Sequence, residues 1–130
     1  MGLRSETKFE NRPGFEEVLD EFGITNSLRV SQHIVRFQHA YQQSNADSDL
    51  PNGFEFKVIE NVRGSYRLCQ IYVGPNNNYR ALVMFPHSRI KGQLLAYWVY
   101  AFKKQRKNDH PKIERAKAIA REYWNSIERA

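Results

Sequence analysis

A group of basic and aromatic residues in the second half of the chain offers the clearest chemistry in this sequence. Its cations are Arg67, Arg80, Lys103, Lys104, Arg106 and Lys107, and Tyr66, Tyr72, Tyr79, Tyr97 and Tyr100 lie among them. Cations neutralise phosphates, and flat rings or guanidinium planes stack on unpaired bases. The combination favours a surface that binds RNA, although packing in the core is the more usual role for any one of these tyrosines.

The charge distribution points in the same direction. Residues 1–65 carry 7 Lys and Arg against 10 Asp and Glu, whereas residues 66–130 carry 13 against 4. This asymmetry favours an anionic partner for the C-terminal half, and nucleic acid is the first candidate. An acidic protein partner and a surface charged only for solubility are the alternatives.

Several other kinds of site are not indicated. His33, His39, His87, His110 and the lone Cys69 form no metal-binding spacing, and the sequence has no phosphate-binding glycine loop. We therefore predict no metal and no cofactor. No apolar run approaches the roughly 18 residues of a membrane span, and the polar N-terminus has no signal-peptide pattern. With a single cysteine, these features predict a cytoplasmic protein without a membrane partner.

Helical periodicity is found at both ends of the chain. Residues 13–22 form a short predicted helix, and apolar residues at spacings of three and four predict a second helix over 26–43. The composition of 44–53 predicts a loop. A final helix is predicted over 111–129, with Pro111 near its start and basic residues on its outer face.

The middle of the chain alternates with a period of two. The predicted strands span 54–62, 66–73, 79–86 and 93–102, and short turns join them into an antiparallel meander. The last strand is apolar on both faces, with Trp98 and Tyr100 expected on one and Val99 on the other. Thr7–Glu10 can add a short strand.

These elements predict one α+β domain over 1–130. Its helical part would occupy 1–50, its sheet of about four strands 54–103, and its C-terminal helix 111–129.

The sequence from Tyr79 to Trp124 also resembles a known protein family. YRALVMF at 79–85 is followed by GQLLAYWVYAFKKQRKNDHPKIERAKAIAREYW at 92–124. The order of Tyr79-Arg80, Phe102-Lys103-Lys104 and a helix with Ile113 and Ala116 is similar to the C-terminal half of the HigB branch of the RelE/ParE toxin superfamily, including its phage-derived members. Two positions depart from that pattern, because Gln70 and Tyr72 stand where the family has a glutamate and an arginine.

The resemblance implies a RelE-like fold and the toxin of a type II toxin–antitoxin pair. Such a protein would be an endoribonuclease that cleaves mRNA on the ribosome by metal-independent attack of a ribose 2′-OH, with a helix-turn-helix antitoxin as its partner. Arg80 with Lys103 or Lys104 would stabilise charge on the phosphate, and Tyr100 or His87 would transfer a proton. Arg67, Arg106 and Lys107 would bind the RNA backbone. The alternatives are a module that binds RNA or the ribosome without cutting, and a protein-interaction domain of the same fold.

Overall fold

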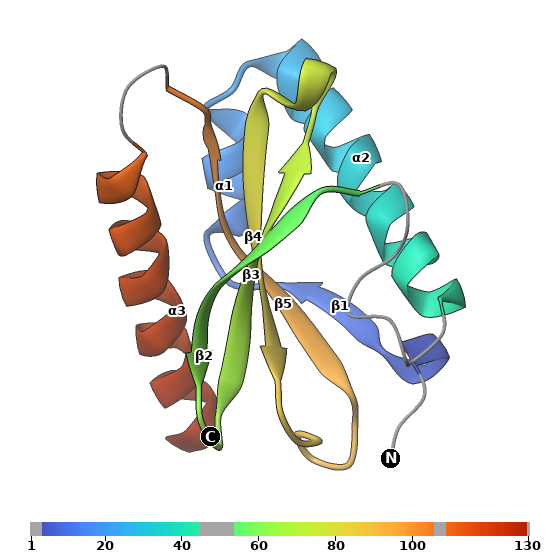
Figure 1. Ribbon diagram of the computed structural model, residues 1–130, viewed down its shortest axis with the longest axis vertical. Helices are drawn as coiled ribbons and strands as arrows, with labels where there is room; N and C mark the ends of the chain where they lie inside the picture. The colour runs from blue at the N-terminus through green and yellow to red at the C-terminus, as the bar shows by residue number, and fades with distance from the viewer. Residues whose placement is uncertain (1–3, 45–53, 106–108, 130) are drawn as a thin grey trace.

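The protein is an α+β domain, seen here in a computed structural model that describes residues 4–44, 54–105 and 109–129 (Figure 1). In chain order its elements are a 3₁₀ turn at Arg4–Glu6, β1 at Lys8–Asn11, α1 at Phe15–Asp20, α2 at Ile24–Gln43, β2 at Phe56–Val62, β3 at Tyr66–Val73, a 3₁₀ turn at Pro75–Asn77, β4 at Tyr79–Pro86, β5 at Leu95–Lys103 and α3 at His110–Arg129. The predicted helices and the four predicted strands are confirmed within a few residues.

The sheet differs from the prediction in the number and direction of its strands. In the described residues it has five strands in the order β1-β5-β4-β3-β2. The meander from β2 to β5 is antiparallel, as predicted, but β1 adds to the outer edge of β5 in parallel, with Phe9 opposite Ala96. The prediction of a purely antiparallel sheet of about four strands is therefore wrong, whereas the short extra strand considered at Thr7–Glu10 is present as β1. The connection between the parallel strands β1 and β5 runs through α1, α2 and the strands β2 to β4, and it is long enough for the crossover that a parallel pair requires.

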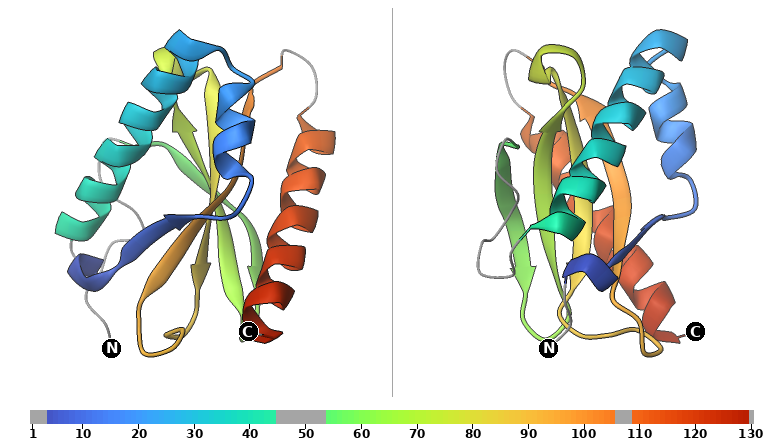
Figure 2. Two further views of the ribbon diagram at one scale, coloured as in Figure 1. Left: turned by 180° about the vertical axis from the view of Figure 1, so that it is seen from behind. Right: turned by 90° about the vertical axis from the view of Figure 1, so that its right-hand side faces the viewer.

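Helices cover both faces of the sheet (Figure 2). On one face, Phe15 of α1 and Val30, Ile34 and Phe37 of α2 pack into a core that contains Trp98. On the other face, α3 packs into a second core through a stripe whose smallest members are alanines. The members of the second core are Tyr66, Leu68, Leu82, Met84, Tyr97, Val99, Phe102, Ala116, Ala120 and Trp124. Side chains of a strand alternate between faces, so β4 and β5 contribute to both cores.

A β-bulge in β5 breaks this alternation. Leu82 of β4 is opposite Tyr100, but the next residue, Val83, is opposite Trp98, so Val99 is the extra residue. Because a bulge re-aims the side chains that follow it, Tyr100 packs beside the second core while Trp98 belongs to the first. The prediction that Trp98 and Tyr100 share a face is wrong, since simple alternation cannot include an inserted residue.

Trp98 lies at the centre of the first core and packs against aromatic side chains of three other elements. It is fully buried, and its ring centroid lies 6.0 Å from that of Phe9 in β1, 6.4 Å from Phe15 in α1 and 5.8 Å from Phe37 in α2. Its indole Nε1 donates a hydrogen bond to Gln38 Oε1 at 2.8 Å. One side chain of β5 thus connects three elements of the N-terminal part.

We expect Trp98→Ala to lower the free energy of unfolding by about 3–5 kcal/mol, because it leaves a large cavity among these rings. Urea denaturation followed by circular dichroism measures this change. Ile24→Ala is the control, because Ile24 is 92% exposed and its truncation should change stability by no more than about 0.5 kcal/mol. Equal effects of the two substitutions would contradict this account of the core.

Candidate nucleic-acid interface

A surface cavity lies where β5 ends beside the α1–α2 junction and the start of α3. It encloses about 320 Å³. Its lining residues are Glu21, Phe22, Asn26, Tyr79, Tyr100, Ala101, Phe102, Lys103 and Lys112. We call it the Tyr100 pocket. It brings two of the predicted site residues, Tyr100 and Lys103, together with Lys112 of α3.

The basic side chains of the Tyr100 pocket lie close to its aromatic rings. Lys112 Nζ is 5.9 Å from the centroid of Phe102, and the guanidinium carbon of Arg115 is 6.0 Å from the centroid of Tyr100. Lys103 is exposed, and Tyr100 is partly exposed. Glu21 is the acidic group in the lining, so cations outnumber anions there. An exposed ring among cations can stack on a base while the cations hold its phosphates.

The strand register separates Arg80 from Lys103. Arg80 is opposite Phe102, and Lys103 is opposite Tyr79. Directly opposed residues share a face, so Arg80 points to the face covered by α3 and Lys103 to the face covered by α1 and α2. Lys104 follows the end of β5, is exposed, and is tied to the β3–β4 turn by its backbone N–H, which donates to Asn78 O at 2.8 Å. The register therefore does not bring Arg80 and Lys103 to one face of the sheet, whereas the alternative pairing of Arg80 with Lys104 stays a prediction.

Arg80 is engaged within the protein. The residue is 5% exposed, and its Nη1 donates to the carbonyls of Asn77 at 2.7 Å and Tyr79 at 3.1 Å. Its guanidinium carbon lies 3.8 Å from the centroid of the Tyr72 ring. These contacts fasten the β3–β4 turn, in which Asn76 and Asn77 both have positive φ. The side chain would have to leave them in order to hold a phosphate.

The two positions that depart from the family pattern lie on the same face as Arg80. Tyr72 is opposite Arg80 in the neighbouring strand, and its ring covers the guanidinium. Gln70 is buried between Lys57 of β2 and Leu82 of β4 in the register, and its Oε1 has no hydrogen-bond partner. A neutral amide cannot act as a general base, so Gln70 does not replace a glutamate in proton transfer.

Other predicted residues lie away from the Tyr100 pocket. Arg67 is five residues before Tyr72 in β3, about 17 Å along the strand, and it shares a face with Phe85 near the end of α2. His87 follows β4 at the same end of the sheet, where its Nε2 is 2.8 Å from Asn61 Oδ1. Arg106 and Lys107 lie outside the described residues. Arg67 and His87 therefore cannot act together with Tyr100 on one phosphate.

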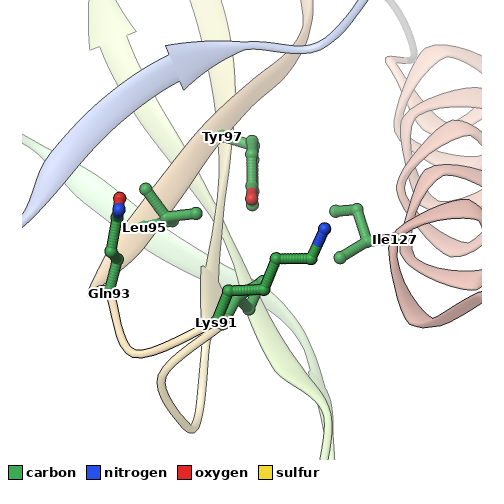
Figure 3. A pocket seen from close by; sticks show the side chains of 6 residues that line it. Lys91, Gln93, Leu95, Tyr97 and Ile127 are labelled. Atoms are coloured by element: carbon green, nitrogen blue, oxygen red, sulfur yellow. The ribbon is translucent and has the colours of Figure 1, made fainter. Parts of the chain in front are cut away.

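A second cavity, of about 260 Å³, lies between the β4–β5 loop and the end of α3. Figure 3 shows Lys91 and Tyr97 extending toward it beside Leu95 and Ile127. Burial raises the pKa of Tyr97 to about 12, with smaller contributions from Tyr123 and Glu10. This hydroxyl stays protonated at neutral pH, and the lining is mainly aliphatic, so the cavity fits a phosphate less well than the Tyr100 pocket does.

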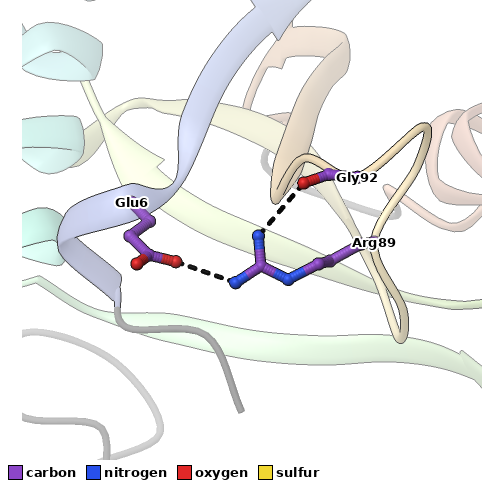
Figure 4. Close-up of polar contacts among 3 residues, drawn as sticks. All are labelled: Glu6, Arg89 and Gly92. Carbon is purple, nitrogen blue, oxygen red and sulfur yellow. Dashed lines mark hydrogen bonds and ion pairs between the residues drawn. The ribbon is translucent and has the colours of Figure 1, made fainter.

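The β4–β5 loop that borders this second cavity is fastened to the N-terminal part of the chain. Arg89 Nη2 is 2.8 Å from Glu6 Oε2, and Arg89 Nη1 donates to Gly92 O at 3.2 Å (Figure 4). Both charged side chains are about half exposed, so the ion pair orients the loop more than it stabilises the fold.

Two further properties of the described residues bear on the site. No cluster of three or more histidine, cysteine, aspartate or glutamate side chains in them is arranged to hold a metal ion. None of the helices they form is both long enough and apolar enough to cross a membrane.

Lys112 and Arg115 are the site residues that the sequence did not single out. Both were predicted on the basic outer face of the last helix, without a link to Tyr100. Their position three residues apart near the start of that helix was the signal that could have found them. Only the packing of α3 on the sheet places them beside Tyr100 and Phe102.

The turn that leads to the Tyr100 pocket depends on a neutral histidine. The backbone N–H of Gly74, which precedes this turn, donates to His33 Nδ1 of α2 at 3.1 Å. Gly74 has φ 82°, and a Cβ added there would lie 2.8 Å from Tyr79 Cδ2. Burial lowers the pKa of His33, and the charge of Arg36 lowers it further.

We expect the free energy of unfolding to fall as the pH drops below about 6.5, the ordinary pKa of histidine, because the unfolded chain then binds a proton that folded His33 resists. The stability that neutral His33 contributes is fully present above about pH 6.5. It is lost as the pH falls from there through the lowered pKa of His33 in the folded protein. His33→Asn keeps an acceptor that does not titrate, so its stability should fall less between pH 7.5 and 5.5. Urea denaturation across this range provides the test, and parallel pH profiles would contradict it.

No family model, curated protein or solved structure matches this chain.

Proposed function

We propose that this protein is an RNA-directed toxin, an endoribonuclease that binds and cuts mRNA at the Tyr100 pocket. The observation that carries the proposal is that Tyr100, Lys103 and Lys112 line one open cavity, with Arg115 beside the Tyr100 ring. The resemblance to HigB-like toxins adds support, because the segments that carry it meet at this end of the sheet. Arg80 is opposite Phe102, and Ala116 packs into the same core as Phe102.

The proposed reaction is a transesterification within the RNA. The ribose 2′-oxygen loses its proton to a base and forms a bond to the neighbouring phosphorus, while the bond from phosphorus to the 5′-oxygen breaks. The 5′-oxygen leaves with a proton, and the products end in a 2′,3′-cyclic phosphate and a 5′-hydroxyl. The attacking group belongs to the substrate, so the reaction needs only groups that move protons and groups that stabilise charge.

The pocket offers one group for proton transfer and several for charge stabilisation. Tyr100 is the group for proton transfer, since it is partly exposed and is the titratable hydroxyl flanked by these cations. Lys103 and Lys112 would neutralise the charge that develops on the phosphoryl oxygens, and Arg115 would hold a neighbouring phosphate. Such a toxin would act in the cytoplasm on ribosome-engaged mRNA, and a helix-turn-helix antitoxin would restrain it.

Binding of RNA without cleavage is the second candidate. It is favoured by Arg80, whose guanidinium is held by two carbonyls and the Tyr72 ring and is therefore kept from a substrate. Gln70 also supplies no base where the resemblance leads us to expect a glutamate. A domain of this kind would occupy RNA or the ribosome through the same cations.

We expect Lys103→Ala/Lys112→Ala to weaken binding of a fluorescent single-stranded RNA, because the two lysines neutralise phosphates. The slope of log affinity against log salt should fall by about 0.7 for each phosphate that the variant no longer neutralises, which fluorescence anisotropy at several salt concentrations measures. Arg63→Ala/Lys91→Ala removes the same charge from exposed positions elsewhere and should leave the slope unchanged. An equal decrease of affinity in both variants would show that the net charge, and not the pocket, binds RNA.

We expect Tyr100→Phe to bind RNA as the wild type does but to cleave it about 10²- to 10⁴-fold more slowly, since only the hydroxyl for proton transfer is removed. Cleavage of ribosome-engaged mRNA is measured by primer extension with a chelator present, and the cyclic phosphate is identified in the product. The variant should also relieve growth inhibition upon expression. If the wild type binds RNA but neither cleaves it nor inhibits growth, binding without cleavage is the correct function.

A further inference from the structure

The outer face of α2 carries an exposed apolar stripe. Ile24, Leu28 and Val35 are 92%, 58% and 47% exposed, and their spacings of four and seven residues place them along one line of the helix. The buried residues Val30 and Ile34 lie on the opposite side, against the sheet. The stripe is therefore not the core side of an amphipathic helix, and exposed apolar side chains in a line are typical of a contact surface.

The charges that α2 itself places near the stripe are of one sign. Arg29 and Arg36 are exposed and follow one flank of the stripe, and the other flank carries uncharged residues such as Ser31. The sequence of α2, from Ile24 to Gln43, contains no aspartate or glutamate. The surface beside Val35 is open and shallow, and it is formed by Ser31, Gln32, Val35 and Arg36.

We propose that this stripe docks an amphipathic helix of a partner protein, whose apolar residues are flanked by glutamate or aspartate. The distance from Ile24 to Val35 is about 17 Å along the axis, which three turns of a partner helix would cover. An apolar side chain of that helix would pack against Val35, and its carboxylates would meet Arg29 and Arg36. This inference does not depend on the proposed function.

A second copy of this chain fits the surface less well. Two α2 helices paired along the stripe would bring four arginines and no carboxylate from either helix into the interface. Like charges across an interface disfavour association, whereas an acidic helix would turn the same arginines into ion pairs.

The test uses two synthetic helical peptides of about 20 residues with the same leucine stripe, one flanked by glutamates and the other by lysines. Isothermal titration calorimetry with the full chain should show binding of the glutamate peptide and at least about tenfold weaker binding of the lysine peptide. Leu28→Asp should reduce binding of the glutamate peptide by at least about tenfold, because it places a carboxylate in the stripe. The position is exposed, so the variant should stay folded, which circular dichroism checks.

A charge reversal gives the sharper discrimination. Arg29→Glu/Arg36→Glu should bind the lysine peptide in preference to the glutamate peptide, whereas Arg63→Glu/Lys91→Glu, with the same net charge, should keep the wild-type preference. Equal binding of both peptides, binding that Leu28→Asp does not change, or no binding would each overturn the proposal. Analytical ultracentrifugation that shows a dimer abolished by Leu28→Asp would also overturn it, because the occupant would be a second copy.

Discussion

Burial of strand β5 on both faces is the constraint on which the rest of the structure depends. Trp98 enters the core below α1 and α2, whereas Tyr97, Val99 and Phe102 enter the core below α3. A strand of this kind is unstable at an open face or an open edge, because its large apolar side chains would be exposed to water. The helices cover the two faces, and β1 pairs along part of the outer edge.

The same strand positions the candidate site, because the register and the bulge decide which side chains meet. The bulge at Val99 moves Tyr100 away from the face of Trp98, and the packing of α3 then brings Arg115 and Lys112 toward it. Lys103 reaches the same pocket from the opposite face, at the end of the strand. At the end of a strand, side chains from both faces of the sheet can reach the same surface, so a site with residues from both faces can form there.

The molecule thus presents two surfaces with different chemistry. At the Tyr100 pocket, cations lie beside aromatic rings, an arrangement that can bind phosphates and bases. The outer face of α2 carries aliphatic side chains and two arginines. Arg80 illustrates how a residue of functional type can serve the fold, since the β3–β4 turn depends on its bonds to two carbonyls. The Arg80 guanidinium stacks on the ring of Tyr72. The residue at position 72, which departs from the HigB-like pattern, therefore affects how Arg80 is held.

Hydrophobic periodicity depends on local geometry, so the sequence was enough to predict the helices α1 to α3 and the strands β2 to β5 close to where they lie. It also indicated that the charge of the C-terminal half gathers near the end of β5. Four further features are visible only in the folded chain: the parallel addition of β1, the inserted residue at Val99, the burial of Arg80 and the separation of Arg67 from Lys103. These features depend on register and on packing between distant segments, and a one-residue change in register moves a side chain to the other face of a sheet, which no local pattern records.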